Sequence, residues 1–322
     1  MVDASAKLAE LRAALSDSQN TELSDADCLR FLTARSADVP KTVAMLGNWE
    51  TWWNTPLPGH ETMLPRDPDL LNPDTKENIY NDLLPHANLG EDKEGRPIYW
   101  ERTGLSTSAS TFMPAALIPS PPFLFPAHTS SIAVSSRFQE VKKHLTEDEI
   151  FVRHIRQQQV MVHRLEECSK RYGRLIEKQV LVLDMKNVSL QMDFMALSAF
   201  KRTVKIDEAC YPERLHVLYV INAPILFHVL WAIVAPWIDN VTKSKFRILG
   251  KNYPQILKEN IPENMIPEEY GGTLKDMSWV YPSNIAMDLD ELRTRLNASK
   301  APTVEDTPDA SPDEASVQLK EG

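Results

Sequence analysis

The hydrophobic pattern of the first 55 residues is helical. In the stretch DVPKTVAMLGNWETWW, apolar residues recur every three or four positions, which is the spacing of an amphipathic helix. Asp38 can cap the amino end of this helix, and Pro40 fits its first turn. The tryptophans of this stretch favour packing over a ligand site. We therefore expect a small helical region over residues 4–55, followed by a proline-rich connector over residues 55–75.

A different pattern follows the connector. Gly95 marks a turn before a strand through Ile98 and Trp100. Continuous apolar runs at residues 180–183 and 217–221 predict two further strands. Between these runs, the stretch DFMALSAFKRTVKIDEACY has helical spacing. Short apolar strands that alternate with helices are typical of an α/β domain whose sheet is covered on both faces.

The segment from Ala223 to Ile238 differs from the rest of the chain, because His228 is the only polar side chain in its sixteen residues. A bilayer-spanning helix needs roughly 20 apolar residues, and Pro224 and Pro236 lie near the two ends, so we expect a helix of about four turns that does not cross a membrane. A helix that is apolar on all sides is buried on all sides, in protein or in lipid. Two interpretations stay open. The helix is either a central core helix, or it packs one face on the domain and turns the other toward a hydrophobic ligand.

The second interpretation sets a physical requirement on a lipid carrier. Each buried CH₂ group contributes about 0.8 kcal/mol, so a chain of 16 carbons contributes roughly 12 kcal/mol. A carrier has to offer an environment nearly as dry as the bilayer before such a lipid can exchange. An apolar helix that closes over the chains supplies that environment, and prolines at its ends are suited to act as hinges.

Composition narrows the classes of function. The chain has 35 Lys+Arg against 45 Asp+Glu, a formal net charge of −10, which argues against nonspecific binding to nucleic acid. Cys28, Cys168 and Cys210 are widely separated and odd in number, which indicates free thiols in a reducing compartment. The amino terminus carries no apolar signal-peptide core, so we expect a cytoplasmic protein.

Motifs of catalysis are absent from the sequence. There is no GxSxG, GxxxxGK[ST], HExxH or GxGxxG pattern. His154 and His163 have no carboxylate at ligand spacing and are expected to be surface or packing residues. We therefore expect no enzyme activity, no catalytic residues, no metal and no cofactor apart from a bound phospholipid ligand.

Polar residues flank the apolar segment. Glu213 lies at the start of the apolar strand that precedes this segment, and Thr242 and Lys245 follow the segment. A phosphate attracts Lys or Arg as donors, whereas the hydroxyl groups of a polyol need carboxylate or hydroxyl partners. An acid, a hydroxyl and a base brought together suit a phosphate joined to a polyol. Taken singly, Glu213 and Lys245 fit ordinary surface residues equally well.

Several stretches together resemble the CRAL-TRIO lipid-binding family, in particular the yeast-type phosphatidylinositol/phosphatidylcholine transfer proteins. They are DCLRFLTARSADV (27–39), EGRPIYW (94–100), VLVLDMKNV (180–188), the run from YPERLHVLYVINAP to PWIDNVTKSKFRILG (211–250) and IPENMIPEEYGG (261–272), in the family's order. The resemblance implies an α/β CRAL-TRIO fold. It has a small N-terminal helical lobe over residues 1–60 and, over residues 75–275, a mixed or parallel sheet that floors a hydrophobic lipid cavity with a helical gate.

The resemblance also implies functional residues. Family members that bind phosphatidylinositol hold its head group with residues that match Arg35, Glu213, Thr242 and Lys245. The segment from Pro224 to Trp237 matches the mobile gate. The residues expected to line this gate and the acyl-chain cavity are Phe227, Leu230, Trp231, Val234 and Trp237.

The second-ligand site departs from the family pattern. Members that bind phosphatidylcholine carry Ser and Thr where this chain has Gln179 and Leu181. Of the two expected tyrosines only Tyr99 is present, because the position near Asn88 is not tyrosine. Gln179 and Leu181 are also poor iron ligands, which argues against haem. A pocket lined by Tyr99, Gln179 and Leu181 would therefore favour another apolar lipid, such as a sterol or an isoprenoid.

Our leading hypothesis is a monomeric protein that binds phosphatidylinositol and a second hydrophobic lipid. It would transfer or present them at Golgi- or ER-type membranes, with which it associates transiently, and so support phosphoinositide synthesis. The alternative is an adaptor that senses a lipid and contacts a protein partner without moving lipid. A lipid hydrolase is disfavoured because the sequence shows no nucleophile and base.

Two segments stand apart. Residues 105–136 contain no Asp, Glu, Lys or Arg and look like an insertion relative to the family, either a floppy loop or a translated intron. Residues 297–322 form an acidic tail without a large aromatic residue, which is expected to be disordered.

Overall fold

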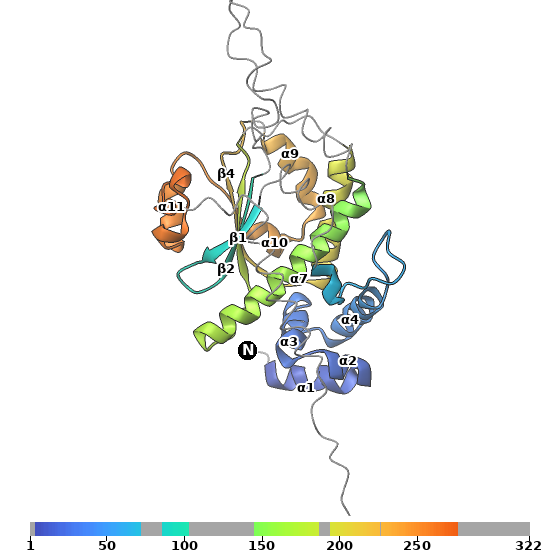
Figure 1. Ribbon diagram of the computed structural model, residues 1–322. Coiled ribbons are helices and arrows are strands. Elements are labelled where there is room, and N and C mark those ends of the chain that lie inside the picture. Colours follow the sequence, from blue (N-terminus) through green and yellow to red (C-terminus); the bar gives the residue numbers. More distant parts are fainter. Residues whose placement is uncertain (1–3, 72–85, 103–144, 187–193, 226, 276–322) are drawn as a thin grey trace, which may run out of the picture.

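A computed structural model describes residues 4–71, 86–102, 145–186, 194–225 and 227–275 (Figure 1). In chain order its elements are α1 (Ala4–Ala14), α2 (Asp17–Glu22), α3 (Asp25–Ala34), α4 (Val39–Trp53), η1 (Pro68–Leu71), β1 (His86–Glu91), β2 (Pro97–Arg102), α7 (Glu147–Tyr172), β3 (Gln179–Asp184), α8 (Phe194–Cys210), β4 (Leu215–Ile221), α9 (Phe227–Val234), η3 (Ala235–Trp237), α10 (Asn240–Ser244), β5 (Phe246–Ile248), α11 (Tyr253–Asn260), η4 (Glu263–Met265) and η5 (Glu268–Tyr270).

Helices α1 to α4 form the N-terminal lobe. The side chain of Asp38 accepts a hydrogen bond from the backbone N–H of Lys41 at the start of α4, as the sequence predicted, and Pro40 lies in the first turn. The lobe's core includes Phe31 and Leu46 and continues into α7 and Tyr211. The lobe is thereby packed against the domain that contains the sheet.

Within the described residues, the sheet has five strands in the order β1-β2-β3-β4-β5. Strand β1 runs antiparallel to β2, and β2, β3, β4 and β5 are parallel to one another. The strands predicted around Ile98, at 180–183 and at 217–221 are confirmed as β2, β3 and β4, and the helix between the last two is α8. Because the parallel strands all begin at one edge, residues just before β3, β4 and β5 are brought together although they are far apart in the sequence.

Helices cover both faces of the sheet, as the sequence predicted (Figure 1). Helix α11 lies on one side, which we call the outer face, and α7, α8, α9 and α10 lie on the other, which we call the inner face. The outer face carries Ile98, Val180, Val182 and Ile221, which pack with Leu257 of α11 and are at most 1% exposed. Alternation along each strand sends the residues between them to the inner face.

The apolar segment departs from expectation. The helix was expected to run for about four turns, but α9 spans only eight residues and the chain then tightens into η3. Pro236 lies in the first turn of η3, where its missing backbone N–H ends the regular α-helical hydrogen bonding. Val229 of α9 is 48% exposed, so the interpretation of this segment as a central core helix is wrong.

Some expectations concern residues outside the described ranges. These are the charge-free stretch at 105–136, the acidic tail at 297–322 and the end of the connector after residue 71.

Candidate functional site

The inner face carries a row of side chains that are only half-buried. Tyr99, Leu181, Leu218 and Phe246 are register partners across β2, β3, β4 and β5, and all four are half-buried. Strands between two layers of helices ordinarily bury both faces. This row beneath the helical layer is therefore only partly covered by it.

Helix α9 lies over this row. Phe227, Leu230 and Trp231 pack against the apolar side chains of the inner face, and the ring centroids of Trp231 and Phe246 are 4.9 Å apart. Within the same helix, Val229 is 48% exposed. An apolar helix with one side on an incompletely filled face and the other in solvent has the properties of a cover. Its role as a gate stays a prediction.

Val234 and Trp237, the remaining residues predicted for the gate and cavity, lie at the end of the segment. Val234 is buried, at 8% exposure. The ring of Trp237 lies 6.4 Å from that of Phe200 in α8, and the ammonium group of Lys201 lies over it at 5.6 Å. Trp237 thus connects the end of the segment to α8.

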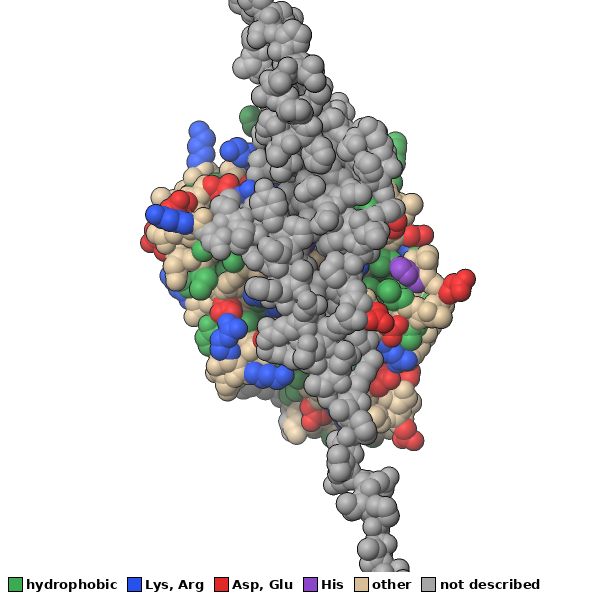
Figure 2. Space-filling model, in the orientation of Figure 1, with side chains coloured by type: hydrophobic (Ala, Val, Ile, Leu, Met, Phe, Trp, Pro, Cys, Tyr) green, Lys and Arg blue, Asp and Glu red, His purple; other side chains and the backbone are tan. Residues whose placement is uncertain are grey.

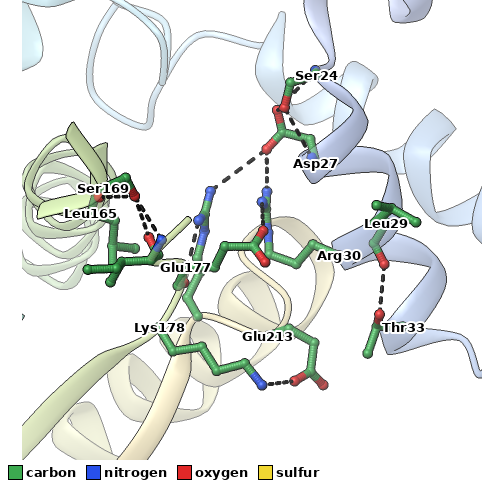
Figure 3. Close-up of polar contacts among 12 residues, drawn as sticks. Ser24, Asp27, Leu29, Arg30, Thr33, Leu165, Ser169, Glu177, Lys178 and Glu213 are labelled. Atoms are coloured by element: carbon green, nitrogen blue, oxygen red, sulfur yellow. Dashed lines mark hydrogen bonds and ion pairs between the residues drawn. The ribbon is translucent and has the colours of Figure 1, made fainter. Parts of the chain in front are cut away.

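A charged group, which we call the edge cluster, lies where the parallel strands begin. Lys178 directly precedes β3, Glu213 lies two residues before β4, and Lys245 directly precedes β5. The Nζ atoms of both lysines are 3.2 Å from Oε2 of Glu213; Figure 3 shows the pair with Lys178. Burial would raise the pKa of Glu213, but the charge of Lys245 and the hydrogen bonds from both lysines outweigh it and lower the pKa. The carboxylate is therefore ionised at neutral pH.

The other two predicted head-group residues are Thr242, which lies in the short helix before Lys245, and Arg35, which caps the carboxyl end of α3. Thr242, three residues before Lys245, donates its backbone N–H to Oδ1 of Asp239 at 3.0 Å. The backbone N–H of Asp239 donates in turn to Oε1 of Glu208 at 2.8 Å. Burial raises the pKa of Glu208, and the positive charge of Arg35 opposes that rise. Two hydrogen bonds thus link Thr242 to Glu208 through Asp239, whereas Arg35 acts on Glu208 through its charge alone. Among the described residues, no hydrogen bond or ion pair joins Arg35 to the edge cluster.

Left-handed backbone conformations mark the same places. Ser36 and Ala37, with φ of 53° and 61°, directly follow Arg35; Glu213 has φ of 59°, and Asn222, with φ of 53°, precedes the apolar segment. Within the described ranges these are the non-glycine residues with positive φ. Such conformations cost on the order of 1 kcal/mol each and persist where the surrounding structure holds them, often at binding sites.

A second group of charges, the interlobe cluster, joins α3 to the sheet domain (Figure 3). Oδ1 of Asp27 lies 2.8 Å from Nη2 of Arg30 and 3.8 Å from Nη2 of Arg214. Nη1 of Arg30 lies 3.8 Å from Oε1 of Glu177. Burial and the charge of Arg30 lower the pKa of Arg214 to about 10, so Arg214 stays cationic at neutral pH.

The interlobe cluster holds both halves of the candidate site in place. Arg214 directly follows Glu213, and Glu177 directly precedes Lys178. Helix α3 ends beside Arg35. The turns that present the edge cluster are therefore tied to the helix that presents Arg35.

The residues predicted for a second lipid share the inner face. Tyr99 and Leu181 are register partners, and Gln179 lies two residues earlier on β3 and is half-buried. The hydroxyl group of Tyr99 donates to Oε2 of Glu101 at 3.0 Å, and burial raises the pKa of Glu101. On the inner face, β2 thus carries polar side chains, whereas β4 carries the apolar side chain of Leu218.

Sequence reasoning missed Lys178 and Glu101. Alternation along β2 from Tyr99 would have placed Glu101 on the same face. Lys178 stands directly before a strand, as Lys245 does, and that shared position was the available signal. The shared position points to a common site only once it is known that the two strands belong to one group of neighbouring parallel strands.

Other kinds of site find no support in the described part of the chain. No group of His, Cys, Asp or Glu there could hold a metal ion, and no helix there is long and apolar enough to cross a bilayer. The three cysteines are free, as predicted, and all three are buried. Figure 2 shows basic and acidic side chains interspersed over the described surface of one face.

The fold and the arrangement along its sheet define a lipid-binding class of protein, and the chain belongs to the CRAL/TRIO domain family. The model of that family matches residues 87–272.

Relatives agree with this assignment. The chain is 30% identical to a CRAL-TRIO domain-containing protein of Saccharomyces cerevisiae, over 78% of this chain and 71% of that one. It is 29% identical to the phosphatidylinositol/phosphatidylcholine transfer protein SFH12 of Arabidopsis thaliana, over 76% of this chain but 39% of that one. The crystal structure of Sfh5 superimposes with a TM-score of 0.58 at 15% identity, over 92% of this chain and 97% of that one, and supports the fold alone.

Proposed function

We propose that this protein binds phosphatidylinositol and a second, apolar lipid in the space along the inner face and transfers or presents them between membranes, supporting phosphoinositide synthesis. The observation that carries the proposal is the edge cluster at the start of the strands that carry the half-buried row, since Lys245 directly precedes Phe246 of that row. The Arabidopsis relative, named as a phosphatidylinositol/phosphatidylcholine transfer protein, supports the same class of ligand.

The chemistry of the two regions suits the two parts of the lipid. The carboxylate of Glu213 accepts hydrogen bonds from ring hydroxyl groups, while Lys245 and Arg35 supply positive charge for the phosphodiester. The acyl chains lie along Leu181 and Leu218 under α9. At about 0.8 kcal/mol per CH₂ group, burial of one 16-carbon chain offsets roughly 12 kcal/mol of exposure to water.

The organisation proposed with this function has three parts. Residues 1–60 form the lobe that presents Arg35, residues 75–275 form the lipid-binding domain, and residues 297–322 form an acidic tail. The protein acts as a cytoplasmic monomer without enzyme activity, metal or nucleic-acid partner, and it meets Golgi- or ER-type membranes transiently. The second lipid occupies the region of Tyr99, Gln179 and Leu181.

Transfer of labelled phosphatidylinositol between liposomes tests the proposal. We expect the double variant Glu213→Ala, Lys245→Ala to lose about tenfold in transfer rate, because it removes a charged donor and its acceptor together. The matched control is Lys258→Ala, Glu263→Ala, which removes an ion pair of 2.6 Å in the outer layer of the protein. Equal transfer by the wild type and the Glu213, Lys245 double variant would refute the proposal. Bound lipid that never exchanges would favour the adaptor instead.

A further inference from the structure

Glu101 places a carboxyl group on the inner face of the sheet. It lies two residues after Tyr99 on β2, so the two side chains share that face. Its register partners across the sheet are His86 on β1 and Leu183 on β3. Leu183 packs against the apolar cluster that includes Phe227 of α9. Glu101 therefore lies at the boundary between polar side chains near β1 and the apolar surface beneath α9.

The carboxyl group of Glu101 can accept more hydrogen bonds than the described residues donate to it. Oε2 accepts the hydroxyl hydrogen of Tyr99 at 3.0 Å, and Oε1 receives no hydrogen bond from the described residues. A carboxylate offers two oxygens and about four lone-pair positions to donors. Burial raises the pKa of Glu101, because it removes water that would stabilise the charge. A carboxyl group in such a place ordinarily has further donors, which a ligand can supply.

A second acceptor lies near the same boundary. Nε2 of Gln157, on α7, is 3.3 Å from Nε2 of His86, the register partner of Glu101. Oε1 of Gln157 is buried and has no hydrogen-bond partner among the described residues. We call Glu101, Tyr99, His86 and Gln157 the boundary cluster. Two acceptors of this cluster thus receive no donor from the described part of the chain.

The charge around Glu101 is already balanced. Nη2 of Arg153, on α7, lies 2.9 Å from Nε2 of His86, and the positive charge of Arg153 acts on Glu101. His154 acts on Glu101 in the same sense but is itself paired with Asp207 at 2.7 Å. One carboxyl group thus faces one guanidinium group. Neither a choline cation nor a phosphate anion gains a net attraction there, so the boundary cluster suits a neutral ligand.

A hydroxyl group suits these surroundings. Its hydrogen can be donated to Oε1 of Glu101, and its oxygen can accept at the same time. A hydrocarbon can do neither, and an ether oxygen can only accept. The carbon skeleton would lie along the apolar side chains of Leu181 and Leu183 on the neighbouring strand. A site that hydrogen-bonds a hydroxyl group discriminates strongly against an analogue that lacks it.

We propose that Glu101 binds the hydroxyl group of the second lipid, so that the inner face takes a neutral lipid alcohol in preference to a hydrocarbon or an ether of similar shape. The inference rests on the proposed function, because it concerns the second lipid of that proposal. Glu101 is the specificity-determining residue, and Tyr99 is a positioning residue that holds its carboxyl group at 3.0 Å.

Competition between an alcohol and its methyl ether tests the inference, because the ether keeps the oxygen but has no hydrogen to donate. The purified full chain is incubated with phosphatidylcholine vesicles that also contain phosphatidylinositol and equal amounts of cholesterol and cholesterol methyl ether. It is then re-isolated, and its bound lipids are counted by mass spectrometry. A parallel set replaces the two sterols with hexadecanol and its methyl ether. We expect the wild type to carry about tenfold more of the alcohol in at least one pair, as one hydrogen bond to a carboxylate allows.

Substitutions of Glu101 separate the hydrogen bond from the shape of the site. In Glu101→Met the ratio should fall to about one, whereas Glu101→Gln keeps an acceptor oxygen and should retain part of the preference. The control is Glu91→Met at the other end of β1. Glu91 is likewise contacted by a tyrosine hydroxyl group, that of Tyr172 at 3.4 Å, and by Arg171 at 2.5 Å. This variant should keep the wild-type ratio, and the wild-type ratio itself tests the inference even where a variant fails to fold.

The outcomes separate this inference from the proposed function. Equal uptake of alcohol and ether in both pairs, or an unchanged ratio in Glu101→Met, overturns the inference while phosphatidylinositol binding stands. A preference for the alcohol without bound phosphatidylinositol supports the inference and overturns phosphatidylinositol binding. Phosphatidylcholine that is bound in place of both alcohols and is lost in Glu101→Met would assign the site to a choline group and overturn the inference. Uptake of none of these lipids overturns both proposals.

Discussion

The two faces of the sheet are built from the same strands but are completed differently. On the outer face, the short helix α11 and the turns after it leave Ile98 and Ile221 with no exposed surface. On the inner face, more helices cover the same strands, yet Leu181 and Leu218 remain half-buried. A face of the sheet can therefore be covered by helices without all of its side chains being buried. The outer face is closely packed, whereas the inner face leaves part of its apolar surface exposed.

The largest expected difference between the faces is in stability. We expect Ile98→Ala to lower the free energy of unfolding by about 3 kcal/mol, because it removes buried methyl groups and leaves a cavity. Leu181→Ala should cost less than about 1 kcal/mol, since that side chain borders space that is already open. Urea unfolding of lipid-free protein measures both. Equal losses at the two positions would show that the inner face is as well packed as the outer.

Substitutions that add side-chain volume provide a second comparison of the two faces. We expect Val182→Trp on the outer face to cost about 2 kcal/mol or more, because a filled core has no room for the indole. Leu218→Trp on the inner face should change the free energy of unfolding by less than about 1 kcal/mol while reducing the lipid that co-purifies several-fold. Unfolding curves and mass spectrometry of bound lipid provide the two readings. A Leu218→Trp protein that still carries its full complement of lipid would place the ligand elsewhere.

A smaller effect concerns Glu213, at the edge where the strands begin. The fold lowers its pKa, so its ion pairs add stability above the pKa that it has in the unfolded chain, and this stability is lost as the pH falls through the lowered value. Between about pH 7 and about pH 3, the wild type should lose up to about 1 kcal/mol more than Glu213→Gln. Urea midpoints across that range measure the difference.

The control for this titration is Glu263→Gln. The Glu263 side chain is 53% exposed, so its ion pair with Lys258 is screened by water and contributes little. That variant should follow the wild-type pH profile. Parallel profiles for the wild type and Glu213→Gln would mean that the edge cluster contributes no stability that depends on its ionised carboxylate.

The elements of the fold were largely readable from the sequence. Strands β3 and β4 appear as continuous apolar runs because helices cover both faces of the sheet, and Asp38 marks the start of α4 because a cap is a local interaction. The predicted length of the apolar helix was wrong. Pro236 interrupts the backbone hydrogen bonding of the helix although the segment is uniformly hydrophobic. Composition could not show which side of α9 is exposed to solvent, because that depends on which residues pack against the other side of the helix.

The candidate site was only partly readable. Glu213 and Lys245 stood out because they flank apolar stretches and match a family motif, whereas Lys178 follows an unremarkable Glu177. Its meaning comes from the pairing of β3 with β4, which brings residues 35 positions apart into contact. The interlobe cluster was invisible for the same reason, since Asp27 and Arg214 meet only in three dimensions.

The direction of the parallel strands also determines where the protein can tolerate change. The edge cluster occupies the starts of β3, β4 and β5, whereas β2 and β3 end at Arg102 and Asp184 on the opposite rim. Arg102 and Asp184 therefore lie a full strand length away from the ion pairs of Glu213. Substitutions on that rim should leave the ion pairs at the starts of β3, β4 and β5 unchanged.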